Sequence, residues 1–195
     1  ENIDVTAVGT SEVLKQDIGK STRSLIDLAI SHDKRDSIIK PTKGYMIKFG
    51  SEIAGLGGDE QFVKSEASGK IYQGIYGNNI IFSTELEGGL LTMNKGYSKI
   101  VDRFVLGGRS FRGFKYNGIG PRELSRGQYT IPLGGEKYAI ARFAASFPLG
   151  LPRELGLYGS VFAEAGSLWD IKTDPNVAGL SDKIALKDRA LRTSI

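Results

Sequence analysis

The chain has 195 residues, a formal net charge of +4 at pH 7, 26 glycines, one histidine and no cysteine. The lack of cysteine excludes a disulfide framework and a thiolate metal site, and the single histidine, His32, offers no histidine cluster. The positive charges are scattered instead of forming a basic stripe, so we expect no nucleic-acid partner and no metal. No apolar run approaches the about 18 residues that a membrane-spanning helix needs.

Alternation of apolar and polar residues runs through most of the chain and predicts strands. In the first segment, Ile26, Leu28 and Ile30 share one face, opposite Asp27 and Ser31. In chain order, the alternating segments are 24–33, 44–55, 62–77, 78–89, 137–149 and 155–169, with the start of a seventh at 191–195. Each of them therefore has one apolar face and one polar face.

The lengths of these segments indicate where the two faces lie. They run to roughly ten to fifteen residues, whereas strands of soluble proteins peak at about five or six. A tilted strand that crosses a bilayer needs about 9–11 residues. The sequence therefore predicts an all-β, antiparallel transmembrane β-barrel, with apolar residues facing lipid and polar residues lining a wet lumen. A large soluble antiparallel barrel or sandwich remains the alternative on alternation alone.

Six strands and the start of a seventh cannot close a water-filled barrel, because an open edge in lipid leaves backbone groups unpaired. We therefore expect residues 1–195 to be a partial barrel domain whose other strands lie outside this chain. The connections alternate between short and long, as in outer-membrane barrels. The expected parts are a loop and strand end at 1–20, short turns at 76–79 and 148–154, and long extracellular loops at 93–134 and 170–188.

The longer loop contains the segment GGRSFRGFKYNGIGP, which begins at Gly107. It resembles the sixth extracellular loop in the bacterial surface antigen family of outer-membrane assembly barrels. The residues that match the family motif are Gly107, Gly108, Arg112, Gly113, Phe114, Gly120 and Pro121. The resemblance covers roughly residues 20–195. It implies the later half of a sixteen-stranded barrel, and it implies that periplasmic POTRA domains are absent from this chain.

The resemblance also implies that the loop folds back into the barrel, with its arginine bound to an acidic residue of the inner wall. Arg112 is the matching arginine, and Glu164 stands at the matching wall position. Gly113 would allow a tight turn, and Phe114 is expected to pack against the wall. The alternative is that Arg112 is solvated while Glu164 pairs with Arg142 on the neighbouring strand.

One position departs from the family pattern. Many members carry a second carboxylate on the preceding strand, where this chain has Ala144. An alanine side chain cannot accept a hydrogen bond. We therefore expect Arg112 to rely on Glu164, on backbone carbonyls or on water.

The function that the resemblance implies is the folding and insertion of β-barrel proteins into the outer membrane of a Gram-negative bacterium. The implied partners are unfolded outer-membrane proteins, outer-membrane lipid and accessory lipoproteins of an assembly complex. We expect no cofactor and no enzymatic activity, because no nucleophile, base and metal set converges in the sequence. The alternatives are a related translocator, of the two-partner secretion or TamA-like branches, and a passive pore or structural barrel.

Overall fold

The computed structural model describes residues 2–3, 17–125, 128–150, 157–172, 184–185 and 191–195. The described residues form strands and connections, and they include no helix long and apolar enough to cross a membrane. The strands are β1 (Asn2–Ile3), β2 (Gly19–Lys20), β3 (Arg23–Asp33), β4 (Lys43–Gly58), β5 (Gln61–Ile75), β6 (Ile80–Lys95), β7 (Arg122–Ser125), β8 (Gln128–Pro132), β9 (Lys137–Pro148), β10 (Tyr158–Trp169), β11 (Ile184–Ala185) and β12 (Arg192–Ser194).

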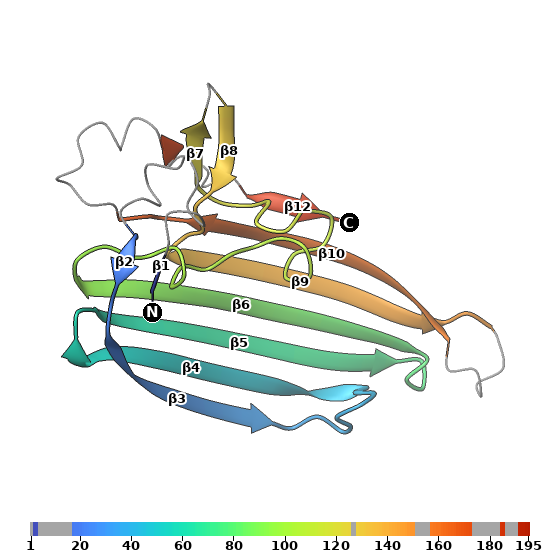
Figure 1. Cartoon of the computed structure of the whole chain (residues 1–195). Helices are drawn as coiled ribbons and strands as arrows, with labels where there is room; N and C mark the ends of the chain where they lie inside the picture. Colours follow the sequence, from blue (N-terminus) through green and yellow to red (C-terminus); the bar gives the residue numbers. More distant parts are fainter. Residues whose placement is uncertain (1, 4–16, 126–127, 151–156, 173–183, 186–190) are drawn as a thin grey trace.

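One curved antiparallel sheet forms most of the molecule (Figure 1). Its seven strands lie in the order β12-β10-β9-β6-β5-β4-β3, and six of them are 11 to 16 residues long. The predicted long antiparallel strands are therefore confirmed. Strands that are consecutive in the chain pair from β3 to β6 and from β9 to β10, whereas β6 pairs with β9, and β10 with β12, across intervening segments. Strands β3 and β12 are the two edges of this sheet among the described residues.

The strand register sorts the side chains onto two faces, as the alternation predicts. Glu85 lies opposite Arg142, which lies opposite Glu164 on the next strand, so the three share what we call the polar face. The other face, here called the apolar face, carries large exposed aliphatic side chains such as Ile30 at 71% and Leu86 at 61%. A continuous apolar surface of this kind requires a cover of lipid or protein.

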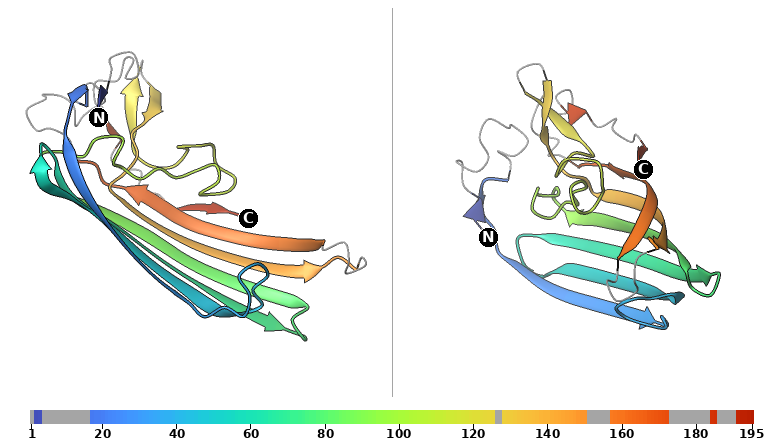
Figure 2. Two further views of the ribbon diagram at one scale, coloured as in Figure 1. Left: turned by 60° about the horizontal axis from the view of Figure 1, so that its bottom comes forward. Right: turned by 90° about the vertical axis from the view of Figure 1, so that its right-hand side faces the viewer.

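The connection between β6 and β9 lies over the polar, concave face of the sheet (Figure 2). The alternation pattern predicts one loop over residues 93–134, and the structure corrects these limits. Strand β6 continues to Lys95, and the connection contains a hairpin of β7 and β8 before β9 begins at Lys137. The short segment QYTIP in β8 contains β-branched and aromatic residues, which favour strand.

The hydrophobic core lies between this connection and the sheet. It joins loop residues to residues of the polar face, among them Phe104, Phe111, Tyr138, Ile140 and Leu168. The connection is therefore packed onto the sheet by its own apolar side chains. Of the predicted loop 170–188, most lies outside the described residues, as does most of the predicted segment 1–20.

Candidate loop-docking site on the polar face

The loop tip, defined as residues 107–116, meets the sheet at Glu164 of β10. One oxygen of the Glu164 carboxylate accepts a hydrogen bond from Arg112 Nε at 2.6 Å, and the other accepts one from the Arg112 backbone N–H at 2.9 Å. The Glu164 side chain is only 2% exposed, whereas that of Arg112 is 45% exposed. The carboxylate therefore binds one loop residue through both its side chain and its main chain.

The same arginine packs on an aromatic ring of the polar face of the sheet, which is called the wall below. The Arg112 guanidinium carbon lies 3.6 Å from the centre of the Phe162 ring, a cation–π contact. Ala144 occupies the position where many family members are expected to carry a second carboxylate. It lies opposite Phe162 in the register of β9 and β10. Where the family pattern would place an acceptor, Arg112 thus has an aromatic face.

Aromatic packing fixes the tip beside this ion pair. Phe111 is fully buried, and its ring packs edge to face against Phe114 with 5.3 Å between centroids. Gly166 on β10 provides the space, because a Cβ atom there would stand 2.8 Å from Cε2 of Phe111. The family resemblance predicts that Phe114 packs against the wall. In the structure Phe114 is partly buried and packs against the core, while Phe111 takes the fully buried position.

The motif glycines shape the turn that carries these side chains. Gly107 accepts hydrogen bonds at its carbonyl oxygen from the Ser110 N–H and hydroxyl, and the Gly108 N–H donates to the Phe114 carbonyl at 2.8 Å. Gly113 has a φ of 81°, a left-handed conformation that favours glycine. At the far end of the motif, Gly120 is buried and Pro121 is fully buried, and the Pro121 carbonyl accepts the Leu133 N–H at 3.0 Å.

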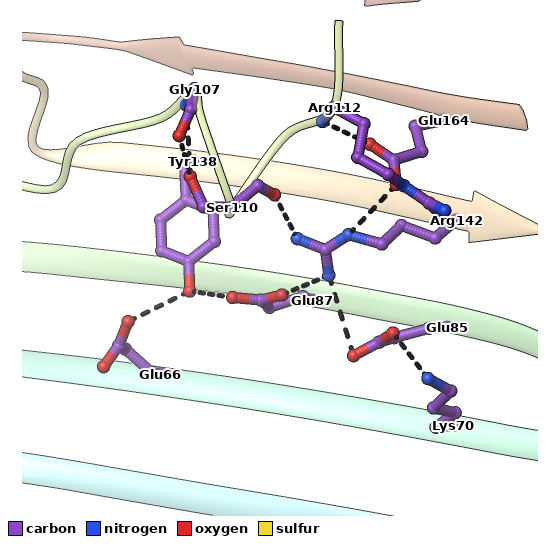
Figure 3. Close-up of polar contacts among 10 residues, drawn as sticks. All are labelled: Glu66, Lys70, Glu85, Glu87, Gly107, Ser110, Arg112, Tyr138, Arg142 and Glu164. Carbon is purple, nitrogen blue, oxygen red and sulfur yellow. Dashed lines mark hydrogen bonds and ion pairs between the residues drawn. The ribbon is translucent and has the colours of Figure 1, made fainter. Parts of the chain in front are cut away.

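A network of charged and polar groups on the polar face surrounds the tip (Figure 3). Arg142 donates to Glu87 at 2.5 Å, and it also donates to the Ser110 carbonyl of the tip at 2.6 Å. Tyr138 donates its hydroxyl within hydrogen-bonding distance of both Glu87, at 2.9 Å, and Glu66, at 3.0 Å. The wall therefore presents one donor, Arg142, to the loop as well as the acceptor Glu164.

The loop root, defined as Ser98, Arg103 and Glu136, is held in a different way. Arg103 Nε donates to the Ser98 hydroxyl at 2.9 Å, and that hydroxyl donates to Glu136 at 2.7 Å. Glu136 also accepts the backbone N–H of Lys172 at 2.8 Å. Burial lowers the pKa of the Arg103 guanidinium, and the nearby carboxylates of Asp17 and Glu136 oppose that shift.

The structure brings together most of the residues that the sequence analysis singled out. Arg112, Gly113 and Phe114 lie at the contact with Glu164, whereas Gly120 and Pro121 lie outside the tip, nearer the hairpin. The alternative pairing of Glu164 with Arg142 is also partly present, since Arg142 Nε lies 4.0 Å from the same carboxylate oxygen.

Phe111, Gly166 and the bonds of Arg142 to the tip were missed by the sequence analysis. A glycine inside a strand pattern signals close approach of another group, so Gly166 could have been found. No group of three or more histidine, cysteine, aspartate or glutamate residues in the described part of the chain is arranged to hold a metal.

A curved antiparallel sheet of long strands, with one exposed apolar face and one polar face that a long loop covers, is the architecture of part of an outer-membrane β-barrel. Comparison with known protein families agrees with this class. The model of the Omp85 superfamily domain matches residues 3–187, and the chain belongs to this superfamily.

Individual relatives give the same result. Over 158 residues the chain is 28% identical to the outer membrane protein assembly factor BamA of Neorickettsia risticii, which covers 80% of this chain and 21% of that protein. Over 155 residues it is 36% identical to the sorting and assembly machinery component 50 homolog of Mus musculus, covering 78% of this chain and 32% of that protein. The chain thus spans between about a fifth and a third of the length of these two relatives.

A solved structure shows the same fold. The crystal structure of BamA from Haemophilus ducreyi lacking POTRA domains 1–3 superposes with a TM-score of 0.64 at 18% sequence identity. The match covers 74% of this chain and 30% of that one. The predicted fold, an antiparallel sheet that forms part of an outer-membrane barrel, is therefore confirmed.

Proposed function

We propose that this chain is part of the barrel of a BamA-like factor that folds and inserts β-barrel proteins into the outer membrane. Support comes from the superfamily match and from relatives whose names describe outer-membrane assembly and sorting. The observation that carries the proposal at the level of residues is the binding of Arg112 to Glu164, whose side chain is almost fully buried.

In this proposal the polar face lines the lumen and the loop tip braces the lumen wall. The exposed apolar face contacts outer-membrane lipid. Lipid covers side chains such as Ile30 and Leu86 without leaving a polar group unpaired. The partners are unfolded outer-membrane proteins and accessory lipoproteins of an assembly complex. The insertion step needs neither a cofactor nor enzymatic chemistry, since an unpaired strand edge can template an incoming strand by backbone hydrogen bonding.

The membrane concerned is the outer membrane of a Gram-negative bacterium. A bacterial relative supports this location, whereas relatives from mouse and from Schizosaccharomyces pombe show that similar chains also occur in eukaryotes. Fractionation of cells that express the full-length protein tests it directly, because the protein should sediment with outer-membrane porins.

The function is tested by reconstituting the full-length protein into liposomes and adding a urea-unfolded outer-membrane protein. We expect the client to reach its heat-modifiable, folded form faster than in empty liposomes. Ion conductance without any acceleration of client folding would contradict the proposal and support a passive pore. Release of the client across the membrane, instead of insertion, would support a translocator.

A further inference from the structure

Arg142 contacts the wall and the loop at the same time. Its Nη1 donates to Glu87 at 2.5 Å and lies 3.6 Å from a Glu85 oxygen. Its Nη2 donates to the Ser110 carbonyl at 2.6 Å, and its Nε lies 4.0 Å from Glu164. The side chain is 17% exposed, so this guanidinium fills the space between β6, β10 and the loop tip.

We propose that Arg142 is a second positioning residue for the loop tip, acting from the wall toward the loop. Arg112 reaches from the loop to a wall carboxylate, whereas Arg142 reaches from the wall to a loop carbonyl. The inference rests on the proposed function, in which the docked tip braces the barrel, and it names the residue that holds the tip in place.

The chemistry of the contact requires an arginine. A backbone carbonyl only accepts hydrogen bonds, so the wall must supply the donor that fixes Ser110. The planar guanidinium presents several donors in a rigid fork, which lets one side chain bind Glu87 and Ser110 together. A lysine ammonium carries the same charge on a flexible stem and does not hold two partners in a fixed geometry.

Neighbouring groups bind the carboxylate oxygens of Glu85 and Glu87 that Arg142 does not approach most closely. Lys70 lies 3.2 Å from the far oxygen of Glu85, and the Tyr138 hydroxyl donates to the Glu87 oxygen that Arg142 does not bind. Glu85 and Glu87 thus each have a second partner besides Arg142. The Arg142 guanidinium thus binds Glu87 of the wall through Nη1 and the Ser110 carbonyl of the loop through Nη2.

This arrangement also explains how the tip docks without a carboxylate at Ala144. Strand β9 contacts the tip through Arg142, two residues before Ala144. Here the strand supplies the hydrogen-bond donor and the loop supplies the acceptor. Both arginines approach the same oxygen of Glu164, Arg112 Nε at 2.6 Å and Arg142 Nε at 4.0 Å. The two tethers therefore share an acceptor, and their effects should be coupled.

The test measures the position of the loop tip in the full-length protein. Residues 1–195 contain no cysteine, so Tyr116→Cys on the exposed tip and Val161→Cys on the apolar face can carry spin labels once any cysteine elsewhere in the full-length protein is replaced by serine. Pulsed electron paramagnetic resonance in nanodiscs should then give one narrow distance distribution. Arg142→Lys, which keeps the charge, should broaden it at least twofold while the barrel remains heat-modifiable.

Lys70→Met is the matched control, because it removes a charged partner of Glu85 that is not bonded to the tip in the structure. We expect it to leave the distribution narrow. Arg142→Gln supplies a second variant, since an amide can donate to Ser110 but cannot also pair with the wall carboxylates, and it should broaden the distribution too.

An unchanged distribution in Arg142→Lys and Arg142→Gln, or equal broadening in Lys70→Met, would overturn the inference. The distance is measured without any client. Failure of client insertion would therefore count against the proposed function and leave this result standing.

Discussion

The root and the tip of the long loop each use an arginine and a glutamate, but they do so in opposite surroundings. Arg103 at the root is 5% exposed and reaches Glu136 through the Ser98 hydroxyl, whereas the Arg112 side chain at the tip is 45% exposed and binds Glu164 directly. A buried charge is costly to leave without a partner, while a half-exposed one is screened by water. The root therefore secures the fold, and the tip is the part whose attachment can be tuned.

The two regions also differ in what they join. The root links the start of the loop to residue 136 before β9 and to Lys172 after β10, so three chain segments meet in one network. The tip contacts side chains on the polar face of the sheet. Loss of the root should thus unfold the connection, whereas loss of the tip should release it.

The largest expected effect is that of Arg103→Ala at the root. Removing this guanidinium takes away the positive charge near the buried Glu136 carboxylate, and it leaves the Ser98 and Leu133 carbonyls without their donor. This should lower the free energy of unfolding by about 3–5 kcal/mol. Urea titration of the full-length protein in detergent, followed by tryptophan fluorescence, measures this loss. A loss no larger than that of Arg112→Ala would break the distinction between root and tip.

At the tip, Glu164→Ala should cost more than Arg112→Ala. The carboxylate accepts both the side-chain and the backbone N–H of Arg112, and it lies beside Arg142. We expect a loss of about 2–3 kcal/mol for Glu164→Ala and about 1 kcal/mol for Arg112→Ala, which keeps the backbone bond. The same titration measures both, and equal losses would show that the backbone contact contributes nothing.

The aromatic contact of the tip is tested by Gly166→Ala. A Cβ atom at this position would stand 2.8 Å from Phe111, so the added methyl group should cost about 1–2 kcal/mol through overpacking. Gly69→Ala on β5 is the matched control, because nothing lies within 4 Å of a Cβ atom there. Similar stability of the two variants would argue that Phe111 is not held against β10.

The smallest expected effect lies outside both regions, in the turn between β3 and β4. The Asp36 carboxylate accepts hydrogen bonds from the Thr42 hydroxyl and from the Lys43 and Thr42 N–H groups, which lower its pKa to about 2. A lowered pKa stabilises the turn above the unfolded pKa of about 3.9, and this contribution is lost as pH falls through about 2. Protection of the turn amides, measured relative to their intrinsic exchange rates, should therefore fall between pH 4 and pH 2, and Asp36→Asn should abolish that dependence while root and tip stay protected.

The sequence predicts the sheet well because alternation is a local property that each strand carries by itself. Ile30 and Leu86 fall on the apolar face, and Glu85 and Arg142 on the polar face, as their spacing predicts. The pairing of Arg112 with Glu164 came from resemblance to a family, since the two residues lie 52 positions apart.

The remaining parts of the site depend on contacts that no local pattern encodes. The choice between Phe111 and Phe114 as the buried ring depends on the space that Gly166 leaves on another strand. The bond from Arg142 to Ser110 depends on the path of the loop across the sheet. The root depends on three distant segments, so neither Arg103 nor Glu136 stands out in the sequence.

A cysteine cross-link tests most directly whether the loop tip docks on the wall. A Cβ atom at Gly113 would lie 3.3 Å from the Cβ atom of Ser194 on β12, close to the separation in a disulfide. Gly113→Cys with Ser194→Cys, in the full-length protein in outer membranes, should form a disulfide that shifts its mobility on a non-reducing gel. Tyr116→Cys with Ser194→Cys is the control and should remain largely reduced. Absence of the Gly113–Ser194 cross-link, or equal cross-linking in both pairs, would contradict a docked tip.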